Sequence, residues 1–149
     1  MTGFFIAIIS GALMSIQGVF NTDVTKSSSL WVAAGFVQLT ALITCIVMWF
    51  ATGRQEIGAI FNVERKYALL GGVIGAFITG TVVLAMSKIG TARAALTIVI
   101  AQVIVAYVIE LLGLFGSEKT QFSLVKLAGL ALAVIGLFIF NLCGNPSQN

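Results

Sequence analysis

Among the polar residues in or beside the apolar stretches of this sequence, four are the ones we expect to bind a solute or a proton. Glu110 and Gln102 belong to the apolar run 94–116, while Gln17 and Asn21 lie at the end of the first apolar run. A carboxylate can hold a proton or a cation, and an amide can both donate and accept hydrogen bonds. We therefore expect these four side chains to form a substrate- or proton-binding site, with no catalytic residue among them.

Glu110 is the most informative of the four because of its depth in a long apolar run. Residues 94–116 are about 23 in number, enough to cross a bilayer as a helix. Glu110 lies five residues past the middle of the run, about 7 Å along a helix. An acid at that depth costs on the order of 3 kcal/mol to insert. Two interpretations stay open: a functional acid, or one that snorkels to the helix end or hydrogen-bonds a neighbouring helix.

The composition indicates an integral membrane protein. The chain has 149 residues, of which 59% are hydrophobic and 9% are charged. A soluble domain carries about a quarter charged residues. We therefore expect a single transmembrane domain over residues 1–149, embedded in a lipid bilayer. The net charge is +3, and all charged residues except Glu110 lie in loops or near helix ends; no basic patch suggests a nucleic-acid partner.

The residue types that most enzymes and metal sites need are missing or isolated. The sequence has no histidine, and its two cysteines, Cys45 and Cys143, form no Cys-x-x-Cys pair. No phosphate-binding glycine loop ending in Lys-Ser or Lys-Thr occurs either. We expect no enzyme, no metal site and no cofactor. The N-terminus lacks the basic residues of a signal peptide, so we expect it to be retained as the first membrane helix.

Five apolar stretches predict an all-α fold with five transmembrane helices. They cover approximately residues 4–20, 30–51, 67–87, 94–116 and 124–143. Polar connections separate them, and the longest and most charged connection is 52–66. Trp31 and Trp49 lie near the two ends of the second stretch, as interfacial anchors do.

Two faces of the predicted helices are expected to contact other protein groups. Ser10, Gln17 and Asn21 fall within about 40° of one another on a helix, and lipid offers them no hydrogen-bond partners. Whether they bind a substrate or a neighbouring helix stays open. In the third stretch a face without bulky side chains would let another helix approach closely; its helix-packing residues are Gly71, Gly72, Gly75 and Gly80.

The Lys and Arg residues set no strong orientation. With five spans, one side of the membrane would collect Arg54, Arg65, Lys66, Lys119 and Lys126, and the other Lys26, Lys88 and Arg93. A bias of five against three is weak under the positive-inside rule. The chain could thus insert in both orientations and form an antiparallel dimer of ten helices with inverted symmetry, which suits alternating access.

Several patterns together resemble the YdcZ-like family of five-helix proteins in the drug/metabolite transporter superfamily. They are Gln17-x-x-x-Asn21, SSSL before AAGF, GGVIGAF, IGTARAALTIVIAQ, Gln102 eight residues before Glu110, LGLFG, and Lys126-Leu-Ala-Gly129. The resemblance implies bacterial inner-membrane transporters that pair antiparallel, as dual-topology homodimers or as paired homologues. It also implies that Gln17, Asn21, Gln102 and Glu110 occupy the family's polar membrane positions. Ser28 and Arg93 depart from that pattern, where the family often has proline and a small residue.

The leading hypothesis is a secondary-active transporter of a small metabolite or cation, with a small-molecule substrate as its partner. An exporter of the small multidrug-resistance type fits less well, because the first span has no acid. A passive pore would also use glutamines and one acid. An accessory subunit without transport needs only the glycine-rich faces. The sequence leaves the last two classes open.

Overall fold

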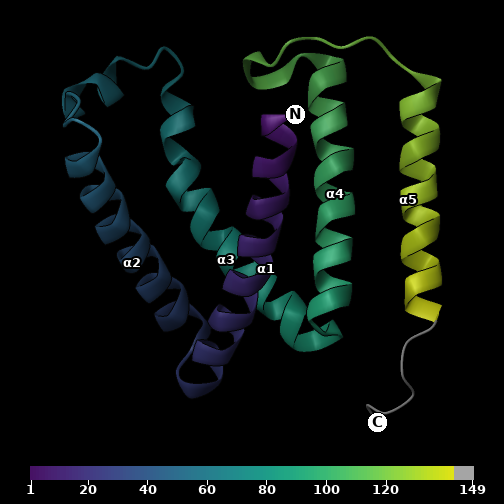
Figure 1. The fold of residues 1–149 in the computed structure, drawn as a ribbon, viewed down its shortest axis with the longest axis horizontal. Helices are drawn as coiled ribbons and strands as arrows, with labels where there is room; N and C mark the ends of the chain where they lie inside the picture. Colours follow the sequence, from purple (N-terminus) through teal and green to yellow (C-terminus); the bar gives the residue numbers. More distant parts are fainter. Residues whose placement is uncertain (143–149) are drawn as a thin grey trace. The chain divides into compact units, whose positions relative to one another are not determined.

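The computed structural model describes residues 1–142, and within them the fold is all-helical with five long apolar helices (Figure 1). They are α1 (Thr2–Ser27), α2 (Leu30–Ala51), α3 (Gly71–Ile89), α4 (Thr91–Leu112) and α5 (Leu124–Leu142). Short 3-10 segments are η1 (Ile57–Asn62), η2 (Lys66–Leu70) and η3 (Leu114–Gly116). Each long helix has the length and hydropathy to cross a membrane, as expected from the sequence. Cys143, where the last span was expected to end, lies outside the described residues.

Helix α1 is longer than the expected span 4–20, because the polar segment after Phe20 stays helical. The hydroxyl of Thr22 donates to the Gly18 carbonyl at 2.8 Å, and that of Thr25 donates to the Asn21 carbonyl at 2.8 Å. These bonds to the preceding turn keep the hydroxyls from competing for the backbone in a turn. The segment also lacks a glycine or proline that would end the helix. Gln17 and Asn21 therefore stand on one continuous helix.

The chain divides into two compact units, Met1–Ser87 and Lys88–Asn149. In the first unit, α1 and α2 are closest at their connection and diverge away from it (Figure 1). The buried residues of this unit lie towards that connection and in the second half of α3: Gly18, Asn21, Ala33, Ala34, Gly80, Val83 and Met86. Gly18 allows the closest approach, since a Cβ atom there would lie 2.5 Å from the Met86 Cε atom.

The glycines of α3 differ in what they face. A Cβ atom at Gly80 would lie 3.9 Å from Leu30 and Trp31, and one at Gly75 would lie 3.4 Å from the Gln38 Nε2 atom. Gly71 and Gly72 have nothing within 4 Å of that position. Half of the expected packing face is therefore used inside the chain against α2, and the half formed by Gly71 and Gly72 is open.

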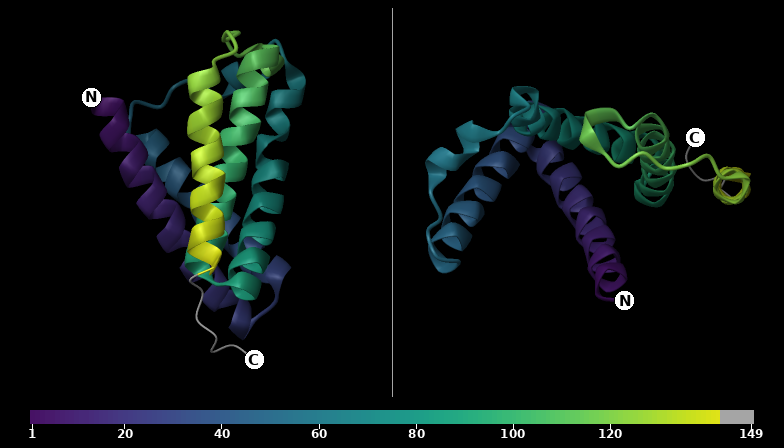
Figure 2. Two further views of the ribbon diagram at one scale, coloured as in Figure 1. Left: turned by 90° about the vertical axis from the view of Figure 1, so that its right-hand side faces the viewer. Right: turned by 90° about the horizontal axis from the view of Figure 1, so that it is seen from above.

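In the second unit, α4 and α5 run antiparallel and side by side (Figure 2). Gly113 ends α4 in the left-handed conformation, with φ of 63°, and its N–H bonds to the carbonyls of Ile109 and Glu110. Tyr107 then fixes the start of α5, because its hydroxyl accepts from the Ser123 N–H at 3.0 Å. Ser123 in turn caps α5 by accepting from the Lys126 N–H at 3.4 Å.

Candidate functional site

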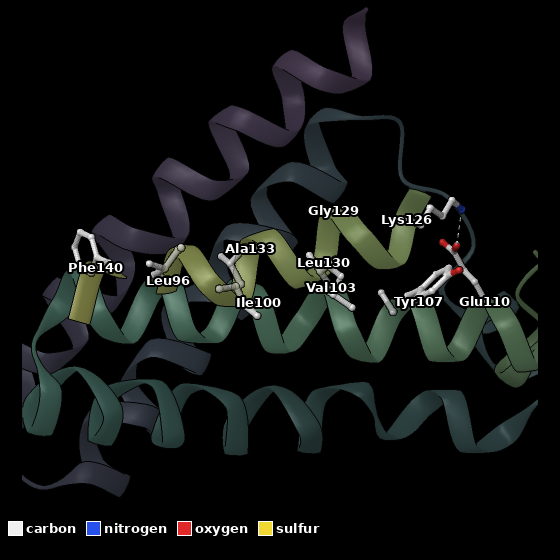
Figure 3. A pocket seen from close by; sticks show the side chains of 13 residues that line it. Leu96, Ile100, Val103, Tyr107, Glu110, Lys126, Gly129, Leu130, Ala133 and Phe140 are labelled. Carbon is white, nitrogen blue, oxygen red and sulfur yellow. Dashed lines mark ion pairs between the residues drawn. The ribbon is translucent and has the colours of Figure 1, made fainter. Parts of the chain in front are cut away.

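A groove of about 780 Å³ runs between α4 and α5, and we call it the α4–α5 groove (Figure 3). Its walls are almost entirely apolar. Helix α4 contributes large side chains such as Leu96, Ile100 and Val103. Helix α5 contributes Leu130 and Phe140 together with small residues. A Cβ atom at Gly129 or at Gly136 would meet nothing within 4 Å, which is why the groove is open along α5.

Glu110 and Lys126 form the polar end of this groove. The Lys126 Nζ atom lies 3.9 Å from Glu110 Oε2 and 5.5 Å from the centre of the Tyr107 ring. The two charged side chains are about half exposed, at 51% for Lys126 and 47% for Glu110. At 3.9 Å the pair is an ion pair without a direct hydrogen bond. Figure 3 shows the lysine reaching across from α5 above the carboxylate.

The connection between the two helices also bonds to Glu110. The N–H of Thr120 donates to the Glu110 carbonyl at 3.0 Å, and the Thr120 hydroxyl donates to Glu110 Oε2 at 3.5 Å. Ser117 donates through its hydroxyl to the Ile109 carbonyl at 3.2 Å. The loop is therefore folded back on the end of α4, and it holds the backbone of Glu110 more firmly than its carboxylate.

The position of Glu110 along its helix differs from the expectation. Helix α4 spans Thr91–Leu112 rather than 94–116, because Gly113 ends it early. Glu110 is consequently about 13 Å from the middle of the helix, not about 7 Å. With the middle of α4 at the bilayer centre, a hydrocarbon half-thickness of about 15 Å would place the carboxylate near the membrane surface, where a charge costs less. The ion pair with Lys126 of the neighbouring helix is compatible with both interpretations of Glu110.

A second groove, of about 580 Å³, lies between α1 and α2, and we call it the α1–α2 groove. Gln17 and Asn21 both line it, one helical turn apart, opposite Thr40 and Thr44 of α2. Asn21 is 8% exposed and is the buried polar residue of the described chain. The expected polar stripe of α1 therefore faces protein at Asn21 and the groove at Gln17.

Gln102 belongs neither to the α4–α5 groove nor to the α1–α2 groove. It is exposed on α4 and lines neither groove. On a helix it is about 100° away from the direction of the residues that face α5. The structure thus brings Gln17 and Asn21 together in the first unit, places Glu110 in the groove of the second unit, and leaves Gln102 on an open face.

Three residues of the groove end were not among the expected site residues: Lys126, Tyr107 and Thr120. The sequence carried a usable signal for Lys126. Two antiparallel neighbours joined by a short loop bring the end of one helix beside the start of the next, and an acid and a lysine stand at those two ends. Tyr107 and Thr120 had no comparable signal, because their partner groups lie on the loop backbone.

A comparison with protein-family models matches residues 2–139 to the family described as "Putative inner membrane exporter, YdcZ". The match covers nearly all of the chain, and it includes all four expected site residues and every lining residue of the two grooves except Phe140. Neither the curated proteins nor the solved structures give a match to this chain.

Proposed function

This chain belongs to the YdcZ family of multi-pass inner-membrane proteins, and on that premise we propose that it is a secondary-active exporter of a small metabolite or cation. We propose further that it works by alternating access as an antiparallel, dual-topology homodimer. Family membership supports a transport role rather than an enzymatic one, as the sequence led us to expect.

The α4–α5 groove is the observation that carries the proposal. It combines a long apolar wall with one charged end. Binding sites for small molecules are typically apolar with a few placed polar groups. In this proposal Glu110 is the proton- or cation-binding group, and Gln17 and Asn21 supply hydrogen bonds from the α1–α2 groove.

A second copy supplies the walls that a single chain lacks. No residue of α5 among Leu124–Leu142 is buried, and Gly71 and Gly72 of α3 meet no other group. Small residues on transmembrane helices favour close contact between helices. An antiparallel copy would place its own Glu110 about 26 Å away along the membrane normal. Each acid would then serve a cavity open to one side. Gln102 would belong to the site through the face of α4 that the second copy covers.

Transport assays with purified protein in proteoliposomes test this proposal. We expect saturable uptake and counterflow for one or more members of a metabolite panel. Glu110→Gln should abolish coupled flux, and Glu110→Asp should retain part of it. Glu118→Gln is the matched control, because Glu118 is an exposed acid on the adjoining loop.

The same assays separate the competing classes. Currents without saturation would indicate a pore, and the absence of flux for every solute would indicate an accessory subunit. Wild-type flux in Glu110→Gln would remove the carboxylate from the mechanism and leave Gln17 and Gln102 as the amides to test.

A further inference from the structure

The charged end of the α4–α5 groove is built around an ammonium group. The Lys126 Nζ atom has a carboxylate oxygen at 3.9 Å and an aromatic ring centre at 5.5 Å. A carboxylate and a ring face within about 6 Å are the two groups that proteins use to recognise organic cations. The position occupied by Lys126 Nζ is thus suited to the amine of a ligand.

Lys126 holds this position only loosely. The distance to Glu110 Oε2 exceeds the 2.7–3.2 Å of a normal hydrogen bond, and both side chains are about half exposed. Exposed ion pairs of this kind contribute little stability. The Thr120 hydroxyl is also distant from the carboxylate, at 3.5 Å. A ligand amine that donates a direct hydrogen bond to Glu110 would therefore be favoured over the lysine.

The rest of the groove indicates the length and polarity of such a ligand beyond its amine. From Glu110 to Leu96 the lining residues extend about 21 Å along α4, and they are almost all apolar. The wall on α5 combines the small residues Gly129, Ala133 and Gly136 with the large apolar side chains of Leu130 and Phe140. An elongated apolar body with one amine at its end fits this shape and charge.

We propose that the α4–α5 groove binds elongated amphipathic monoamines, with the ligand amine displacing Lys126 from Glu110 and Tyr107. Lys126 then acts as a built-in competitor that occupies the cation position while the groove is empty. The physiological meaning of this inference rests on the proposed transport function. The binding itself is tested without a solute or ion gradient across a membrane.

Three probes of one shape and different charge measure the preference. They are phenylbutylamine, phenylbutanol and phenylbutyrate, which share an aromatic body and a four-carbon chain and carry a positive, no and a negative charge. We expect purified wild-type protein at equilibrium to bind the amine about tenfold more tightly than the alcohol, because only the amine gains a charged hydrogen bond and the ring contact. The carboxylate should bind most weakly.

Substitutions then locate the site and test the competition. Glu110→Gln should weaken amine binding about tenfold and leave the alcohol unchanged. Lys126→Met should tighten amine binding about two- to fivefold, because the weak ion pair no longer has to be broken. Lys119→Met is the matched control, since Lys119 is a loop lysine outside the groove and on the same expected side of the membrane. Tyr107→Phe retains the ring and should retain amine binding.

Three outcomes would overturn the proposal. Stronger binding of phenylbutyrate would assign the site to an anion held by Lys126. Equal binding of the amine and the alcohol, unaffected by Glu110→Gln, would assign the groove to a neutral apolar chain such as that of a lipid. Binding of none of the probes would indicate that a second copy covers the groove. Amine binding without flux of any solute would instead remove the transport function and leave the site intact.

Discussion

The close approach of α1 and α3 at Gly18 gives a quantitative test of the first unit. A methyl group added there would lie 2.5 Å from Met86 Cε and 2.7 Å from Met86 Sδ, whereas carbon atoms pack favourably at about 3.5–4.0 Å. The end of the buried Met86 side chain must therefore move by about 1 Å. Methionine is flexible, so we place the cost at about 1–2 kcal/mol, at the lower part of the range for overpacked cores.

Gly11→Ala is the matched control for Gly18→Ala, since Gly11 is on the same helix two turns earlier with nothing within 4 Å of the added atom. Both changes gain the same helix propensity, up to about 1 kcal/mol, which cancels in the comparison. We expect Gly18→Ala to unfold about 1–2 kcal/mol more readily than Gly11→Ala in a titration with a denaturing detergent. The difference should disappear when both are combined with Met86→Ala.

An equal effect of the two alanines would refute this reasoning, and so would a difference that persists without the Met86 side chain. In the first case α1 and α3 do not approach at Gly18. In the second case the cost comes from something other than the Sδ and Cε atoms. The coupling between the two positions is the measured quantity, so an overall loss of stability from Met86→Ala does not affect the conclusion.

Three further changes test other parts of the fold and of the proposed dimer. Reporter fusions at the C-terminus should detect both orientations of the chain. Two or three lysines added within residues 22–29 should favour the orientation with that segment in the cytoplasm. A single orientation in the wild type would require a homologous partner in place of an identical copy. Gly72→Leu should weaken crosslinked dimers while leaving unfolding unchanged, whereas Gly75→Leu should destabilise the chain itself, since Gln38 is 3.4 Å from the added atom. Gly90→Ala should lower the free energy of unfolding by about 1–3 kcal/mol in the same titration. The reason is that Gly90 has φ of 84° and ψ of 156°, which an alanine rarely adopts. An unchanged unfolding midpoint would mean that the backbone can relax there.

The helices themselves could be predicted from the sequence, because hydropathy and length decide membrane spans without reference to packing. The residues at which the helices begin and end could not be predicted in this way. By polarity alone, Thr22 and Thr25 would be assigned to a loop. Their hydroxyls instead donate to backbone carbonyls of the preceding turn, and both residues are helical. Conversely, the apolar residues after Leu112 continue the hydrophobic run, while Gly113 ends the helix through its left-handed backbone.

The candidate site could be predicted only in part. The sequence identifies which polar residues lie in apolar surroundings, but not which of them face the same groove. Gln17 and Asn21 share a groove, as one helical turn suggests. The eight-residue spacing of Gln102 and Glu110 does not bring them together, because only Glu110 points towards α5. Lys126 could have been inferred as the partner of Glu110 from the short connection between the two helices, but the loop contact of Thr120 could not, because loop geometry has no periodic signal.

The continuous helix α1 has a consequence for the lipid that suits this protein. Its apolar part, Phe4–Phe20, is about 26 Å long, and its polar part, 21–27, adds about 10 Å. The apolar part is therefore about 4 Å shorter than a typical hydrocarbon core of about 30 Å. Thinning of the surrounding bilayer would take up the shortfall, at a fraction of a kcal/mol per Å. Bilayers of short-chain lipids match α1 without deformation, and a thick, sterol-rich bilayer would pull the charged pair Asp23 and Lys26 towards hydrocarbon.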